Sequence, residues 1–123
     1  MVGRLVDDPT AMPYADIMLT LIESSVFTRW VGEYMDDDEY AGFQVFLAAN
    51  PEAGDVIPGS GGVRKIRWAR KGVGRRGGIR VVYYVQRRRQ EIWLLTIYVK
   101  SKLDNVPARV VMAMKEAFEH GKS

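Results

Sequence analysis

The chain has 123 residues, and its formal net charge of +3 conceals two regions of opposite charge. Residues 63–89 hold eleven basic residues and no acidic one, whereas the rest of the chain sums to −8. Clustering of this kind indicates an anionic partner and carries no information about the fold. The chain has no Cys and one His, His120, which excludes disulfides, thiolate metal sites and cysteine nucleophiles and nearly excludes Ser-His-Asp triads and multi-His zinc sites.

Length and hydrophobicity predict one compact domain. The hydrophobic fraction of 47% is typical of a chain with a core. No apolar run approaches the roughly 20 residues that a membrane span requires. The N-terminal segment carries Asp7 and Asp8 and lacks a signal-peptide pattern. We therefore expect a disordered arm over residues 1–14, a single domain over 15–120 and a cytoplasmic protein.

The first half of the chain predicts one strand and two helices. Residues 16–23 alternate enough to indicate a strand, and Ser24 or Ser25 can cap the helix that follows. The acidic run 36–39 favours the start of a second helix, because carboxylates there cap free N–H groups and suit the helix dipole. Asn50-Pro51 ends it. The expected apolar faces are Val26, Trp30, Val31 and Tyr34 on the first helix, and Tyr40, Phe43, Phe46 and Leu47 on the second.

The second half predicts three strands and a last helix. A loop over 51–62 precedes strands at 63–70, 79–86 and 91–100, which are separated by a Gly-rich turn and by a turn at 87–90. Asp104 or Asn105 is expected to open the helix that presents Val106, Val110, Val111, Met114 and Phe118 on one face. The order β-α-α-β-β-β-α predicts an α+β domain, an antiparallel sheet with helices packed on one face.

Alternation along the strands sorts the basic residues by face. Ile66, Trp68, Val81, Leu95 and Ile97 are expected to face the helices. The opposite, exposed face is expected to collect Lys65, Arg67, Arg80, Tyr98 and Lys100. Such a face suits RNA, because guanidinium groups pair with phosphates and rings stack on unpaired bases. The alternative is a solvated strand face with scattered arginines.

Two short patterns are better explained by structure than by chemistry. Residues 72–77 match the dinucleotide pattern G-x-G-x-x-G, but a strand follows instead of a helix, so nucleotide binding is rejected in favour of a hairpin loop. The acidic run 36–39 is interpreted as a helix start, because consecutive carboxylates do not converge on one metal ion. We expect no metal site and no cofactor.

An ordered series of short motifs runs from Ala49 to Lys100. It comprises Asn50-Pro51, Gly54-Asp55-Val56-Ile57, Gly61-Gly62-Val63-Arg64-Lys65, the Arg-Gly-Gly before Arg80, Tyr83-Tyr84 and Leu95-Thr96-Ile97-Tyr98. In this series the chain resembles the RelE/ParE superfamily of bacterial toxins, and within it the HigB-type branch of RelE-like toxins from type II toxin–antitoxin modules. The rest of the domain fits the element order of that family.

The resemblance implies a metal-independent endoribonuclease that cuts mRNA on translating ribosomes. In such toxins the RNA 2′-hydroxyl attacks the adjacent phosphorus, which requires a base, cations for the developing charge and an acid for the leaving oxygen. Carried over by position, the implied catalytic residues are Lys65, Arg67, Arg80, Lys100 and Tyr98. The general base stays open between Lys65 and Lys100.

The other basic residues are expected to grip the backbone of mRNA or ribosomal RNA: Arg64, Arg70, Lys71, Arg75, Arg76, Arg87, Arg88 and Arg89. The resemblance further implies an antitoxin encoded by a neighbouring gene, of the helix-turn-helix DNA-binding kind. It would either lay an acidic segment over the basic face or bind elsewhere and block entry to the ribosome. The alternative functions are a ParE-like toxin that inhibits gyrase and a non-catalytic RNA-binding module.

Overall fold

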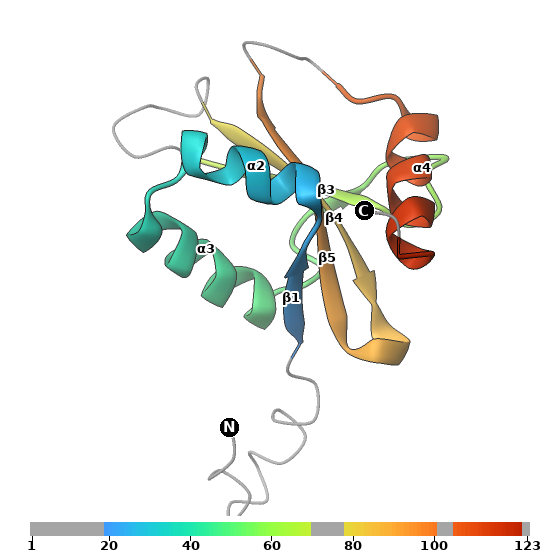
Figure 1. Cartoon of the computed structure of the whole chain (residues 1–123), viewed down its shortest axis with the longest axis horizontal. Coiled ribbons are helices and arrows are strands. Elements are labelled where there is room, and N and C mark those ends of the chain that lie inside the picture. The colour runs from blue at the N-terminus through green and yellow to red at the C-terminus, as the bar shows by residue number, and fades with distance from the viewer. Residues whose placement is uncertain (1–18, 70–77, 101–104, 122–123) are drawn as a thin grey trace, which may run out of the picture.

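The computed structural model describes residues 19–69, 78–100 and 105–121. These residues form a five-stranded sheet, with strand order β1-β5-β4-β3-β2, and the helices packed on it (Figure 1). The elements are β1 Thr20–Glu23, α2 Ser25–Tyr34, α3 Asp37–Ala49, β2 Asp55–Val56, β3 Arg64–Trp68, β4 Ile79–Gln86, the 3-10 helix η3 Arg87–Arg89, β5 Glu91–Val99 and α4 Ala108–Glu119. No helix within them is long and apolar enough to cross a membrane.

The strand order places β5 inside the sheet, between β1 and β4. Strands β2 to β5 pair antiparallel, as expected, but β1 pairs with β5 in parallel, with Leu21 opposite Ile92. The sheet is therefore mixed rather than wholly antiparallel. The short strand β2 lies inside the segment expected to be a loop, and the N-terminal arm and the Gly-rich turn fall outside the described residues.

Helices cover both faces of the sheet. Phe27 of α2 and Phe43 and Leu47 of α3 pack on one face, against residues such as Val81 and Leu94. On the other face Val111 packs with Val82, Trp93, Leu95 and Tyr98, and Met114 and Phe118 of α4 border this cluster. Figure 1 shows α2 and α3 on one side of the strands and α4 on the other. The mixed α+β architecture is confirmed, but α4 does not share a face with the other helices.

Helix starts follow the sequence signals in the first two helices. The Ser24 hydroxyl accepts the Phe27 N–H at 3.0 Å, so Ser24 rather than Ser25 caps α2. Asp36 accepts from the Glu39 N–H at 2.7 Å while Glu39 accepts from the Asp36 N–H, forming a capping box. The start of α4 was predicted wrongly for Asn105, because Pro107 occupies the N-cap without a side-chain bond. Asp104 lies outside the described residues.

The buried face of α2 is rotated from the expected one. Val26 and Trp30 are 45% and 44% exposed, whereas Phe27 is fully buried. Val31 and Tyr34 do border the core, as expected. Residues 27, 31 and 34 have helical spacing as good as that of 26, 30 and 34, so periodicity did not separate the two sets. On α3 Phe43 and Leu47 are buried, while Phe46 is 38% exposed and contacts Trp68.

A β-bulge changes the facing of one predicted core residue. The pairing of β4 with β5 steps from Val82 opposite Thr96 to Tyr83 opposite Leu94, which leaves Leu95 without a partner on β4. Leu95 consequently joins Trp93 and Tyr98 on the α4 face, opposite to its expected facing. Ile66, Val81 and Ile97 pack on the α2 and α3 face as expected, and Trp68 borders that cluster.

Candidate reaction site and nucleic-acid interface

Three predicted site residues form a row across neighbouring strands. Arg67 on β3 lies opposite Arg80 on β4, and Arg80 lies opposite Tyr98 on β5. The next row on the same face holds Lys65 opposite Val82. Because neighbouring strands are about 4.8 Å apart, the three backbone positions of the first row span only about 10 Å. Pairing thus brings these four side chains to one face of the sheet.

This face is buried rather than exposed at its centre. Arg80 is 5% exposed and Tyr98 is 8% exposed, whereas Arg67 is exposed and Lys65 is partly buried. The expectation of a fully exposed basic face is therefore wrong for Arg80 and Tyr98. The Tyr98 ring belongs to the cluster around Val111 of α4, so the helix on this face contributes to the burial. A ligand would meet Arg67 and Lys65 first.

Few hydrogen bonds link the two buried members of the row to other described residues. Nη1 of Arg80 donates to the Gly78 carbonyl oxygen at 3.3 Å. The Tyr98 hydroxyl is buried and has no hydrogen-bond partner among the described residues. Burial raises the pKa of Tyr98, and the nearby charge of Arg80 opposes part of that rise. Tyr98 is therefore a neutral phenol at neutral pH, able to donate a hydrogen bond or a proton.

The two lysines have different surroundings. Nζ of Lys65 donates to Oδ1 of Asn105 at 2.9 Å, so the segment that leads into α4 holds this ammonium group. Lys100 directly follows β5 and is exposed. Sequence reasoning did not identify Asn105 as part of the site, because it was interpreted as a helix cap. The Lys65 amine is therefore held next to the row by a hydrogen bond, whereas the Lys100 amine is exposed at the end of β5.

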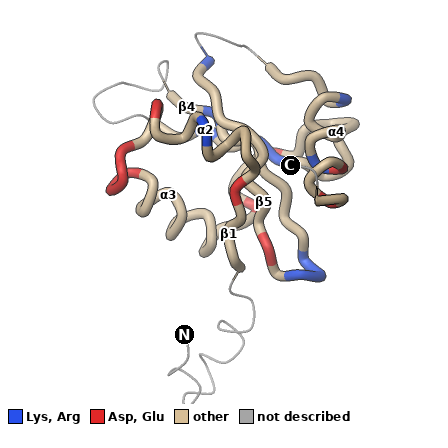
Figure 2. Tube along the Cα trace, in the orientation of Figure 1, with Lys and Arg blue, Asp and Glu red and all other residues tan. Residues whose placement is uncertain are grey.

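Arg87, Arg88 and Arg89 lie apart from the row. Arg88 and Arg89 are exposed in η3, and the neighbouring Arg87 pairs with Glu52. This basic tip, at the turn between β4 and β5, is visible in Figure 2. Arg87 follows Arg80 by seven positions, about 23 Å along the direction of β4. The expected contacts Arg70, Lys71, Arg75 and Arg76 lie outside the described residues.

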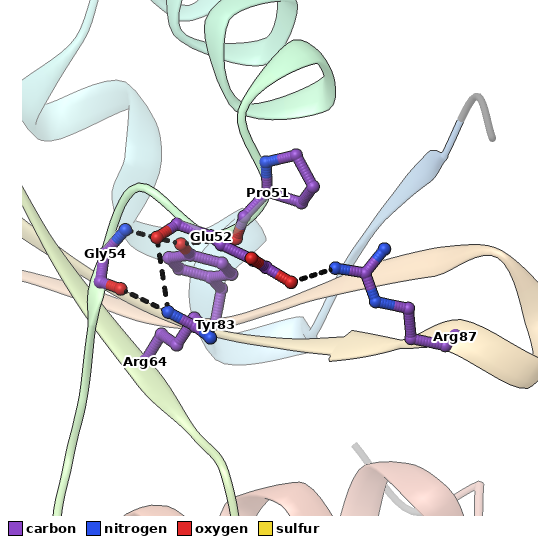
Figure 3. Close-up of polar contacts among 6 residues, drawn as sticks. All are labelled: Pro51, Glu52, Gly54, Arg64, Tyr83 and Arg87. Carbon is purple, nitrogen blue, oxygen red and sulfur yellow. Dashed lines mark hydrogen bonds and ion pairs between the residues drawn. The ribbon is translucent and has the colours of Figure 1, made fainter. Parts of the chain in front are cut away.

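Arg64 takes part in a second polar cluster, which lies on the opposite face (Figure 3). Its Nη1 donates to the carbonyl oxygens of Glu52 at 3.2 Å and Gly54 at 2.7 Å. The Tyr83 hydroxyl accepts the Gly54 N–H at 2.9 Å and donates to the Pro51 carbonyl at 2.8 Å. We call these contacts of Arg64 and Tyr83 with residues 51–54 the loop clamp. The motifs Arg64-Lys65 and Tyr83-Tyr84 contain its side chains, but neither motif indicated this contact.

Within the described ranges, no group of three His, Asp or Glu side chains is arranged to hold a metal ion. Asp36 and Glu39, from the acidic run, are engaged with each other's backbone N–H groups in the capping box. In the part of the chain that the structure describes, the α4 face of the sheet carries the guanidinium groups of Arg67 and Arg80, the Lys65 amine and the Tyr98 phenol.

No family model matches the chain. Its fold is similar to that of the E. coli toxin RelE, solved as a mutant in the free state. The two structures superpose with a TM-score of 0.53 at 15% sequence identity, and the match covers 80% of this chain and 97% of the RelE chain. The near-complete coverage shows that this chain has a RelE-like fold.

Proposed function

We propose that this protein is the toxin of a type II toxin–antitoxin system and that it cuts mRNA on the ribosome. The observation that carries the proposal is the row of Arg67, Arg80 and Tyr98 with Lys65 beside it. The RelE-like fold supports the assignment, and the ordered motifs from Ala49 to Lys100 favour the HigB-type branch. A cytoplasmic location follows from the proposed target.

The proposed reaction is a transesterification within the RNA. The 2′-oxygen bonds to the adjacent phosphorus and loses its proton to a base. The bond from phosphorus to the 5′-oxygen breaks, and that oxygen takes a proton from an acid. The products are a 2′,3′-cyclic phosphate and a 5′-hydroxyl, so atoms and charge balance without a redox partner. Catalysis of this step consists of proton transfer and stabilisation of charge on the phosphoryl oxygens.

The site offers a group for each requirement. Arg80 is a buried cation, and a phosphate oxygen would be a favourable partner for its guanidinium because buried charges are costly when unpaired. Arg67 lies opposite it at the more exposed end of the row. Tyr98 remains protonated because burial raises its pKa, which suits hydrogen-bond donation to the phosphate or proton donation to the leaving oxygen. Lys65 and Lys100 are the two candidates for the base.

Substrate and partner binding would use the surrounding charge. Arg88 and Arg89, with the cluster over residues 70–76, are proposed to contact the phosphate backbone of ribosomal RNA or mRNA. The proposed antitoxin is a helix-turn-helix DNA-binding protein encoded beside this gene. It neutralises the toxin by covering the basic face or by preventing access to the ribosome.

Induced expression with and without the adjacent gene tests the function. We expect growth arrest without that gene, together with new mRNA ends that carry a 5′-hydroxyl. Arg80→Ala and Arg67→Ala should abolish both effects, and Arg29→Ala, an exposed arginine on α2, should not. DNA damage without new mRNA ends would instead indicate a ParE-like gyrase toxin. Harmless expression of a folded protein would indicate a non-catalytic RNA-binding module.

A further inference from the structure

We infer that Arg64 and Tyr83 are positioning residues, which hold β3 so that Lys65 and Arg67 face the reaction site from the opposite side of the sheet. This inference rests on the proposed function for its kinetic consequences. It replaces the expected role of Arg64 as a contact to RNA phosphates. It also assigns a task to Tyr83, which is fully buried and has no access to RNA.

Nη1 of Arg64 and the Tyr83 hydroxyl are already engaged within the loop clamp. Nη1 of Arg64 makes two hydrogen bonds to backbone carbonyl oxygens, and the Tyr83 hydroxyl is used as both donor and acceptor. An arginine committed in this way would have to break bonds to carbonyl groups before its Nη1 could bind a phosphate. Hydrogen bonds from a charged donor are stronger than those between neutral groups, so the commitment is costly to reverse.

The clamp acts on the part of β3 that carries the reactive side chains. Strand β3 lies between β4 and β2, and β2 has only two residues, which pair with Lys65 and Arg64. Gly54, directly before β2, lies so close to β3 that an added Cβ would come within 2.9 Å of the Lys65 carbonyl oxygen. The backbone of Lys65 is therefore packed against the clamped loop, and a shift of that loop moves Lys65.

Alternation of side chains transmits the clamp to the other face. Arg64 and Lys65 are adjacent, so their side chains leave β3 on opposite sides. Tyr83 on β4 likewise lies next to Val82, the partner of Lys65, and pairs with Arg64 itself. Arg64 and Tyr83 thus lie opposite each other on the α2 and α3 face, while Lys65 and Val82 lie opposite each other on the α4 face. The loop clamp fixes the strand register in which the residues of the α4 face meet.

The test compares Arg64→Met, Arg64→Lys and Tyr83→Phe with Arg29→Met, a control that removes an exposed charge from α2. Cleavage of mRNA on ribosomes gives kcat and KM, and RNA affinity is measured over a salt series. We expect Arg64→Met and Tyr83→Phe to lower kcat about 10- to 100-fold, since small misplacements of reactive groups have effects of that size. KM and the salt dependence of binding should stay as in the wild type, and Arg64→Lys should recover part of kcat.

Amide hydrogen exchange provides a readout that does not depend on activity. Faster exchange at Val56 and Arg67 in Tyr83→Phe, with the far end of β5 unchanged, would support the positioning role even if the wild type cuts no RNA. A wild-type protein that cuts no RNA would contradict the proposed function but not the positioning role. The inference is overturned if Arg64→Met weakens RNA binding and its salt dependence while kcat is unchanged. It is also overturned if Tyr83→Phe matches the wild type in both kcat and exchange.

Discussion

Arg80 on β4 lies directly opposite Tyr98 on β5, and both side chains are more than nine-tenths buried. A cation and a neutral phenol on paired positions in a buried environment interact more strongly than they would in water. The Arg80 charge also favours the ionised form of Tyr98, although burial outweighs it. The pair can therefore offer a phosphate one charged and one neutral donor.

Tyr98→Phe should separate catalysis from stability. The hydroxyl has no hydrogen-bond partner among the described residues, so its removal should leave the free energy of unfolding unchanged or slightly raised. Loss of an acid or a donor from the reaction should lower the rate of mRNA cleavage about 100-fold or more. Urea unfolding and single-turnover cleavage on ribosomes measure the two effects. Full activity in a stable Tyr98→Phe protein would remove Tyr98 from the site.

Sequence patterns predicted which strand residues share a face better than they predicted how the helices pack. Alternation alone placed Lys65, Arg67 and Arg80 on one face, because β3 and β4 pair without interruption over those residues. The predicted position of Tyr98 on that face was also correct, but only because the bulge at Leu95 lies before it and the facing of residues 96–98 was taken from their own alternation. The burial of Arg80 and Tyr98 was not predictable, since it depends on the face that α4 covers.

The facing of the helices was harder to predict for a physical reason. An apolar stripe such as that of α4, with Val111 and Phe118, requires burial but does not specify which face of the sheet receives it. The same limitation applies to α2, where Phe27 and Trp30 belong to two overlapping apolar stripes and only Phe27 is buried. Only the contacts of the folded chain separate such alternatives.

Ser24→Ala should destabilise the fold, whereas Ser25→Ala should not. The Ser24 hydroxyl accepts the Phe27 N–H and donates at 2.8 Å to the carbonyl oxygen of Leu95, the bulged residue of β5. Alanine leaves both buried partners without that bond, at a cost of about 1–2 kcal/mol. Ser25 is exposed at the first position of α2 and serves as the matched control. Equal unfolding free energies for the two variants would contradict the capping role of Ser24.

Alkaline solution should destabilise the protein in part through Tyr40. Burial, together with the hydrogen bond and charge of Glu23, raises the pKa of Tyr40 well above its usual value near 10. The folded state therefore keeps this proton to higher pH than the unfolded state. The resulting stability is complete below about pH 10 and is lost as pH rises toward the folded-state pKa.

Tyr40→Phe should flatten that dependence. Urea unfolding of the variant and the wild type at about pH 8 to 12 compares how steeply the free energy of unfolding falls with pH in each protein. The wild type should lose stability more steeply above about pH 10, because only the wild type carries the Tyr40 hydroxyl. Tyr83 and Tyr98, whose pKa values burial also raises, contribute to both curves alike. Parallel curves would show that the Tyr40 proton is not linked to folding.

The basic tip should bind RNA without taking part in the reaction. Arg88 and Arg89 are exposed on η3, which lies at the end of β4 distant from Arg80. Each arginine that neutralises one phosphate contributes about 0.7 to 0.9 to the slope of log affinity against log salt, depending on whether the RNA is single-stranded or duplex. Arg88→Gln and Arg89→Gln together should therefore reduce that slope by up to about 1.4–1.8 and raise KM.

The same double variant should leave kcat unchanged once ribosomes are saturating, because the tip lies about 23 Å from the row along β4. Arg87 is a useful comparison, since its guanidinium already pairs with Glu52, and Arg87→Gln should alter the slope less than either exposed neighbour. A fall in kcat at saturating ribosomes would place the tip in the reaction site. An unchanged salt slope would show that RNA does not contact it, and the docking surface would then have to lie nearer to Arg67 and Lys65.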